Sequence, residues 1–224
     1  MIYMNKVKDN FQAFLVEDAN FVGKEEYPMI EKWMISEDPP QKIIPFNKIN
    51  EVKNIDEYYI CFYCRDEDFS RVKRNPRQYV NLFKRSKGII GFDFSVHTDM
   101  PLVKQKSQIN GNLSLTYFFG KAGVNVIPNI RYGVNDTKED FVKAIPKGSL
   151  IAFGTYGFIK SIDEQNVWFI VLLDMIKQLR PSGIIIYGSL PSDLKNWIYL
   201  NGVQLYIYPS HMDTKMKEVK LSGN

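Results

Sequence analysis

The chain has 224 residues, of which 45% are hydrophobic and 14% are aromatic. This composition excludes a disordered chain and is sufficient for one well-buried core, so we expect a single domain over residues 1–224. Lysine and arginine exceed aspartate and glutamate by 29 to 25, which gives a formal net charge of +4. A charge of this size is too small to predict a polyanionic partner by itself.

No targeting signal or membrane span is visible in the sequence. Residues 1–10 lack the run of about 7–15 apolar residues of a signal peptide, and no stretch reaches the roughly 18 apolar residues of a membrane span. We therefore expect a cytoplasmic protein with no membrane partner. The only cysteines, Cys61 and Cys64, lie in a predicted strand, where residues three apart point to opposite faces. A structural role is favoured over a metal or redox site.

The predicted elements begin with an irregular N-terminal cover. Residues 1–42 form this cover, residues 43–211 the core, and residues 212–224 a polar tail that is predicted to be flexible. Short helices are expected in the cover at 11–16 and 27–35. In the core, apolar runs predict strands at 42–46, 58–64, 88–95, 124–132, 149–153, 183–188 and 203–208. Between them, helices are expected at 75–85, 113–121, 137–144, 163–179 and 192–200.

Continuous apolar strands that alternate with helices are typical of a parallel sheet covered by helices on both faces. The sequence therefore predicts an α/β fold with a mainly parallel sheet of six or seven strands. A closed barrel of eight units takes about 250 residues, so a barrel here would be short or incomplete. We prefer such a barrel-like sheet to an open twisted sheet.

Polar residues follow the predicted strands, and parallel α/β folds bind ligands at the carboxyl ends of their strands. The strand at 88–95 leads into the densest group of ionisable and hydroxyl side chains. We therefore predict one pocket with two sets of residues. The expected catalytic residues are Asp93, Asp99 and His97, and the expected substrate-binding residues are Ser95, Asn129, Arg131 and Tyr187.

Each of these assignments has a structural alternative. Asp93 is either a general base or an anchor for the following loop, and His97 is either an acid–base residue or a surface histidine. Asp66 and Asp68 would suit Mg²⁺ or Ca²⁺ only with further oxygen ligands, so an ordinary acidic loop is favoured and no metal residue is assigned. The segment Gly154 to Gly157 lacks the lysine of a P-loop, and a tight turn is favoured there. The sequence identifies no cofactor.

One interval of the chain is strongly basic. It runs from residue 65 to residue 87 and includes Arg71, Arg74, Arg77 and Arg85, with Tyr79 among them. Such an interval is either a solvated helix face or a surface that follows a nucleic-acid backbone.

Several segments resemble a known family. The segments that carry the resemblance include Tyr59-Ile-Cys-Phe-Tyr, Asp93-Phe-Ser, Asp99-Met-Pro and Val126-Ile-Pro-Asn-Ile-Arg-Tyr132. Across roughly residues 43–190 the chain is similar to the domain-of-unknown-function family 4417. The resemblance implies a bacterial, phage or plasmid-borne protein with no established activity, so it assigns no catalytic residue.

Two main functional hypotheses follow. The first is a hydrolase or lyase in which Asp93 works with Asp99 or His97 while Arg131 holds an anion, and it predicts that Asp93→Asn leaves the fold intact while abolishing activity. The alternative is a non-enzymatic binding protein from a phage or mobile element, with nucleic acid or a host or phage protein as its partner. A structural or assembly protein is a third possibility.

Overall fold

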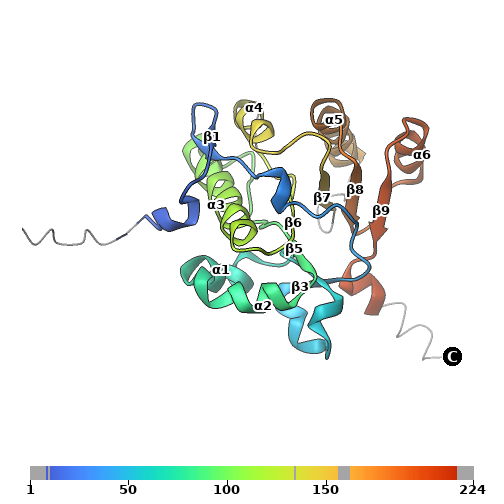
Figure 1. The fold of residues 1–224 in the computed structure, drawn as a ribbon. Coiled ribbons are helices and arrows are strands. Elements are labelled where there is room, and N and C mark those ends of the chain that lie inside the picture. The colour runs from blue at the N-terminus through green and yellow to red at the C-terminus, as the bar shows by residue number, and fades with distance from the viewer. Residues whose placement is uncertain (1–8, 10, 134, 156–161, 216–224) are drawn as a thin grey trace, which may run out of the picture.

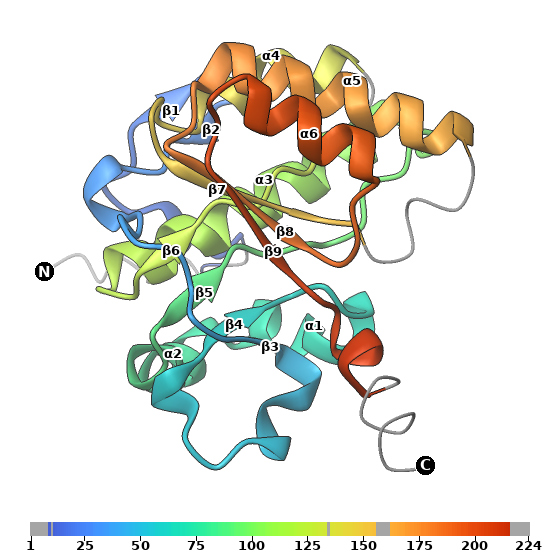
Figure 2. The same ribbon diagram turned by 90° about the vertical axis from the view of Figure 1, so that its right-hand side faces the viewer.

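The computed structural model describes residue 9 and residues 11–133, 135–155 and 162–215, with the backbone alone for residues 162–168. Within these ranges the core contains two parallel sheets (Figures 1 and 2). The first has four strands in chain order: β3 (Ile43–Pro45), β4 (Tyr59–Cys61), β5 (Gly88–Ile90) and β6 (Val126–Ile127). The second has three: β7 (Leu150–Gly154), β8 (Gly183–Tyr187) and β9 (Leu205–Tyr208). The α/β class and the parallel pairing are confirmed.

The two sheets touch at one isolated parallel bridge between Asn129 and Ala152. Ala152 N donates to Pro128 O and Ile130 N donates to Ala152 O, both at 2.9 Å. Both sheets are open, so the described residues do not confirm the predicted barrel-like sheet. The two sheets do not form one continuous sheet because the pairing between them is short. β6 contributes only two residues to its ladder, and a single bridge follows it.

In the described part of the chain, six α-helices of at least six residues connect or follow the strands. They are α1 (Asp66–Arg74), α2 (Val80–Arg85), α3 (Leu102–Lys121), α4 (Asn135–Lys143), α5 (Ile162–Leu179) and α6 (Ser192–Leu200). In both views α4, α5 and α6 lie side by side above the three-stranded sheet (Figures 1 and 2). No helix in the described part of the chain is long and apolar enough to cross a membrane.

The sheets bury residues on two faces, as continuous apolar strands require. One face joins the main core under the helices, which includes Ile60, Phe62 and Ile89. The other face forms a second cluster whose members all lie in strands or directly after one: Tyr59, Cys61, Tyr63, Ile90, Ile127, Leu150, Ala152, Ile185 and Tyr187. This face packs strand side chains from both sheets together, which differs from the predicted helical cover on both faces.

The N-terminal cover differs from its prediction. Residues 27–35 were expected to be helical, but β2 (Tyr27–Pro28) pairs antiparallel with β1 (Phe21–Val22), and a 3-10 turn, η2 (Lys32–Met34), follows. The antiparallel pairing of Tyr27 and Pro28 with the preceding strand explains the difference, because it holds the start of the segment in an extended conformation. The other 3-10 turns are η1 (Ala13–Val16), η3 (Phe46–Glu51), η4 (Ile55–Glu57) and η5 (Pro76–Tyr79).

Further along the chain, α3 begins at Leu102 instead of the expected residue 113, directly after Pro101. At the C-terminus, residues 211–215 are helical, although they were assigned to a flexible tail from residue 212, and residues 216–224 lie outside the described part.

Candidate functional site

The carboxyl ends of all seven parallel strands border one cavity of about 560 Å³. Each strand supplies at least one lining residue, either its last residue or one within a few residues after it. The lining residues are Pro45, Asn47, Lys48, Tyr63, Cys64, Arg65, Asp68, Asp93, Ser95, Arg131, Gly154, Tyr187, Ser210, His211 and Met212. The cavity therefore lies where a parallel α/β fold places its ligands.

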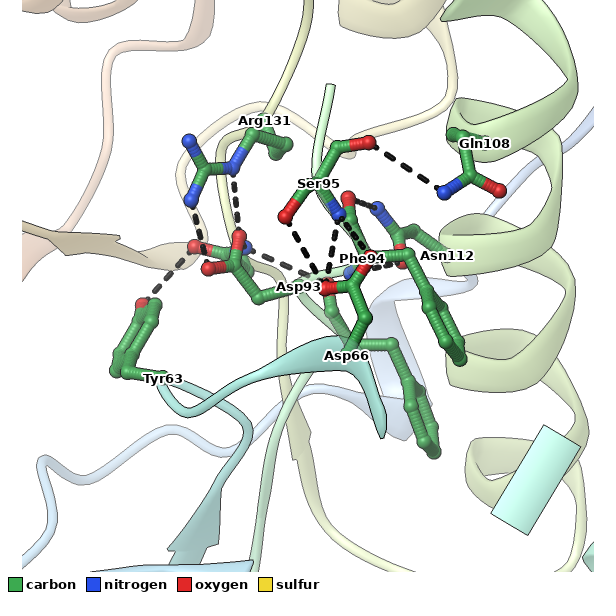
Figure 3. Close-up of polar contacts among 10 residues, drawn as sticks. Tyr63, Asp66, Asp93, Phe94, Ser95, Gln108, Asn112 and Arg131 are labelled. Atoms are coloured by element: carbon green, nitrogen blue, oxygen red, sulfur yellow. Dashed lines mark hydrogen bonds and ion pairs between the residues drawn. The ribbon is translucent and has the colours of Figure 1, made fainter. Parts of the chain in front are cut away.

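A buried ion pair forms one wall of the cavity (Figure 3). The Arg131 guanidinium donates from Nε to Asp93 Oδ1 and from an Nη to Asp93 Oδ2, each at 2.7 Å. Asn129 Nδ2 also donates to Asp93 Oδ1 at 2.7 Å. Burial alone would lower the pKa of Arg131, but the charge of Asp93 and its hydrogen bonds outweigh burial and raise that pKa. Arg131 therefore stays charged, and Asp93 neutralises its charge.

Two tyrosines continue this wall. Tyr63 donates from its hydroxyl to Asn129 Oδ1 at 2.9 Å, and its ring stacks on Tyr187 with the ring centroids 5.3 Å apart. Gly154 makes this position possible, since a Cβ atom at residue 154 would lie 2.5 Å from the Tyr63 ring. Burial raises the pKa values of both tyrosines, so both hydroxyls stay protonated at neutral pH.

The segment after β5 is held by side chains instead of by a neighbouring strand (Figure 3). Asn112 on α3 accepts a hydrogen bond from Phe94 N at 2.9 Å and donates one to Phe94 O at 3.1 Å. Ser95 donates from its N and its Oγ to Asp66, at the start of α1, over 3.1–3.2 Å. These bonds replace the sheet ladder, which is why the strand predicted to reach residue 95 ends at Ile90.

The structure brings together only part of the predicted site. Four of the predicted residues line the cavity: Asp93, Ser95, Arg131 and Tyr187. Asn129 is not a lining residue but donates a hydrogen bond to Asp93. By contrast, the predicted catalytic residues His97 and Asp99 are exposed in a turn after this segment and do not line the cavity. The turn is closed by a hydrogen bond from Met100 N to His97 O at 3.1 Å.

The sequence places His211 among the polar residues at the strand ends, but sequence reasoning assigned it no role. His211 follows β9 and lines the cavity, and its backbone N donates to the Tyr187 hydroxyl at 2.9 Å. Its position directly after the last strand, in Pro209-Ser210-His211, was the signal available in the sequence.

The described residues contain no group of three His, Cys, Asp or Glu side chains that could hold a metal ion. Asp66 and Asp68 lie in the first turn of α1, where negative charge complements the helix dipole. Both cysteines are free; Cys61 packs in the cluster of strand side chains and Cys64 borders the cavity. Burial raises the pKa of the Cys64 thiol to about 12. Tyr156 and Gly157 of the predicted turn lie outside the described residues.

The basic interval starts at the cavity, which Arg65 lines, and continues through α1, η5 and α2. Arg71, Arg74, Arg77 and Arg85 are all exposed. The Arg71 guanidinium lies over the Phe46 ring, 5.1 Å from its centroid, and the Arg77 guanidinium lies 4.0 Å from the centroid of Phe14. These rings hold two of the four arginines in place while leaving them at the surface.

The comparisons with known proteins agree with this chain's resemblance to a family. The family model described as "Domain of unknown function (DUF4417)" matches residues 22–202. The chain belongs to this family. One relative, the "Gene 1 protein" of Mycobacterium phage L5, is 24% identical over 162 residues, which cover 72% of this chain and 69% of the relative. The "Gene 1 protein" of Mycobacterium phage D29 is 22% identical over 158 residues, covering 70% of this chain and 57% of the relative. No solved structure matches.

Both relatives are phage proteins, which agrees with the expected phage or mobile-element setting of this DUF4417 chain.

Proposed function

We propose that this DUF4417 protein binds a small polar molecule in the cavity and acts on it as a hydrolase or lyase. The observation that carries the proposal is the convergence of all seven parallel strands on one cavity with a buried Asp93–Arg131 pair in its wall. A cavity of about 560 Å³ has the size of a small-molecule site. Its mixture of tyrosine rings and a few fixed polar groups is also typical of such sites.

The ion pair refines the expected roles of its two members. Asp93 Oδ1 accepts two hydrogen bonds and Oδ2 accepts one, and a carboxylate has about four acceptor positions, so Oδ2 can still accept a donor from a ligand. Asp93 neutralises the charge of Arg131. The pair would therefore orient a ligand through hydrogen bonds more than attract it through a net positive charge. The proposed ligand therefore carries a hydrogen-bond donor toward Asp93 and an apolar or ring portion toward Tyr63 and Tyr187.

The proposal is tested by screening polar metabolites, such as sugars, nucleosides and amino acid derivatives, for an increase in melting temperature. Met212→Trp would fill the cavity from its rim, since Met212 lines it and is 46% exposed. Leu200→Trp is the matched control, because Leu200 is 86% exposed at the end of α6, outside the cavity. We expect compounds that stabilise the wild type and Leu200→Trp but not Met212→Trp. Equal stabilisation of all three proteins, or of none, would contradict the proposal.

Turnover is followed by mass spectrometry of each stabilising compound after incubation with the protein. Release of a hydrolysis or elimination product by the wild type, and not by Met212→Trp, is expected of an enzyme. Binding without any product would favour the non-enzymatic alternative.

A second candidate function, nucleic-acid binding, is favoured by the basic interval. Between Phe69 and Phe92 the chain carries seven lysines and arginines and no acidic residue. In the described structure, Arg74, Lys84, Arg85 and Lys87 make no ion pair and are exposed, so their charges are available to phosphates. Such contacts would make affinity fall steeply with salt.

This candidate is tested by fluorescence anisotropy with a labelled oligonucleotide at several salt concentrations. The variant Arg74→Gln, Arg85→Gln, Lys87→Gln is compared with Lys104→Gln, Lys147→Gln, Lys177→Gln, which removes the same charge from exposed sites elsewhere. Loss of three phosphate contacts should reduce the slope of log affinity against log salt by about three in the first variant only. Equal effects of the two variants would point to net charge alone.

A further inference from the structure

The two ring nitrogens of His211 lie in different environments. Nε2 is buried and lies 3.2 Å from Glu51 Oε2, in an ion-pair contact without the alignment of a full hydrogen bond. Nδ1 makes no hydrogen bond among the described residues and is not among the buried nitrogens there. Because His211 lines the cavity, Nδ1 is the ring nitrogen available to a ligand.

Glu51 is itself fixed at the end of η3. Lys48 and Lys215 each place Nζ 2.9 Å from a Glu51 carboxylate oxygen. Hydrogen bonds from Lys215 and then from Lys48 lower the pKa of Glu51 to about 2, so this carboxylate is charged throughout the neutral range. A charged carboxylate beside Nε2 favours the tautomer that carries its proton on Nε2.

The backbone around His211 is fixed as well. Its N donates to the Tyr187 hydroxyl, and the preceding Ser210 donates from N and Oγ to Asp213, at 3.2 and 2.6 Å. The backbone that carries the imidazole is thus held by a strand-end tyrosine and by a short helical turn. Among described residues, Glu51 contacts the imidazole and is itself paired with Lys48 and Lys215. The other charged residues that line the cavity with His211 are Arg65, Asp68, Asp93 and Arg131.

We propose that His211 is the acid–base residue of the cavity and that Glu51 positions it. This inference rests on the proposed hydrolase or lyase function and replaces the expected role of His97. In hydrolysis, Nδ1 accepts a proton from water as the water oxygen bonds to the substrate. The bond to the leaving group then breaks, and Nδ1 returns the proton to that group. Asp93 is less suited to this role because it is paired with the charged Arg131 guanidinium, which stabilises the carboxylate and disfavours proton uptake.

The tautomer is tested without any substrate by nitrogen NMR of the full chain. The chain has only two histidines, so His97→Gln removes the other imidazole signal and identifies that of His211. We expect neutral His211 to carry its proton on Nε2, and Glu51→Gln to give a mixture of the two tautomers. A proton on Nδ1 in the wild type, or an unchanged spectrum in Glu51→Gln, would overturn the proposal.

The acid–base role is tested with a compound turned over by the wild type. His211→Gln should lower kcat about 100-fold or more with little change in KM, and it should remove one limb of the pH–rate profile. If Met212→Trp abolishes turnover but His211→Gln does not, the cavity is the active site and the role of His211 is wrong. If Met212→Trp leaves turnover unchanged, the proposed function itself fails.

Discussion

At the scale of single residues, the Asp93–Arg131 pair constrains how the site can be altered. The two side chains are only 8% and 14% exposed, so each is the main partner that makes burial of the other's charge tolerable. Removing one member of such a pair is strongly destabilising, whereas replacing both with apolar groups is often close to neutral. The expectation from sequence that Asp93→Asn leaves the fold intact therefore has to be revised.

We predict that Asp93→Asn and Arg131→Met each lower the free energy of unfolding by about 3–5 kcal/mol. The double variant Asp93→Leu, Arg131→Met should lose less than the sum, because it leaves no uncompensated charge. Urea denaturation of the three variants and the wild type measures this difference. Additive losses would mean that the two charges do not depend on each other.

Gly154 allows a second prediction at this scale. A methyl group at residue 154 would overlap the Tyr63 ring, which cannot move without leaving Tyr187 and Asn129. We expect Gly154→Ala to cost about 1–3 kcal/mol of stability by overpacking. Gly111→Ala is the control in urea denaturation, because the nearest atom there is the mobile end of Lys73, at 3.4 Å. A loss of stability in both variants would show that the Tyr63 position is not the cause.

At the scale of elements, α3 holds the segment that carries Asp93. Asn112 is 6% exposed and satisfies both backbone groups of Phe94, so the segment depends on one side chain from a helix. Loss of that side chain leaves two buried backbone groups without a partner.

Asn112→Ala should therefore cost about 2–4 kcal/mol and speed hydrogen exchange at the Phe94 amide. Asn110→Ala is the matched control, since Asn110 is exposed on the same helix. Urea denaturation and hydrogen exchange read by NMR measure both effects. Unchanged exchange at Phe94 in the Asn112 variant would rule out this role.

The accuracy of the sequence predictions also varied by element. The helix expected at 192–200 matches α6, and β8 lies within its expected range, because strong apolar patterns and Pro–Gly breaks bound both. The first half of α3 was missed because residues 102–112 are mostly polar.

Parallel topology correctly placed Asp93, Arg131 and Tyr187 at one edge of the fold. The path of a loop, however, cannot be predicted from strand patterns. For that reason the sequence favoured His97, whereas the fold brings His211 to the cavity.

At the scale of the whole molecule, contacts distant in sequence join the C-terminal segment to the first part of the core. Glu51 on η3 contacts His211 and Lys215, and the Tyr208 hydroxyl donates to Pro40 O. These contacts give stability a pH dependence. The pKa of Glu51 is about 2 when folded, against an ordinary value of 4.5, so its contribution is fully present above about pH 4.5 and is lost as the pH falls toward 2.

We therefore predict that the wild type melts at a higher temperature than Glu51→Gln at pH 7, and that the difference shrinks between about pH 4.5 and pH 2. Glu37→Gln is the control, because Glu37 is exposed and makes no ion pair among the described residues. Thermal melts across this range measure the effect. A difference that grows on acidification would contradict the assigned sign.

The chain order of the strands has a consequence for biosynthesis. β3 and η3 leave the ribosome early, yet one side of the cavity consists of Ser210, His211 and Met212, which are translated after the last described strand, β9. A nascent chain can thus assemble its first sheet, and even the Asp93–Arg131 pair, well before it has a finished pocket. Premature termination near residue 209 would yield a largely folded protein that lacks the proposed proton-transfer residue, so any activity of this site should appear only in chains translated beyond that point.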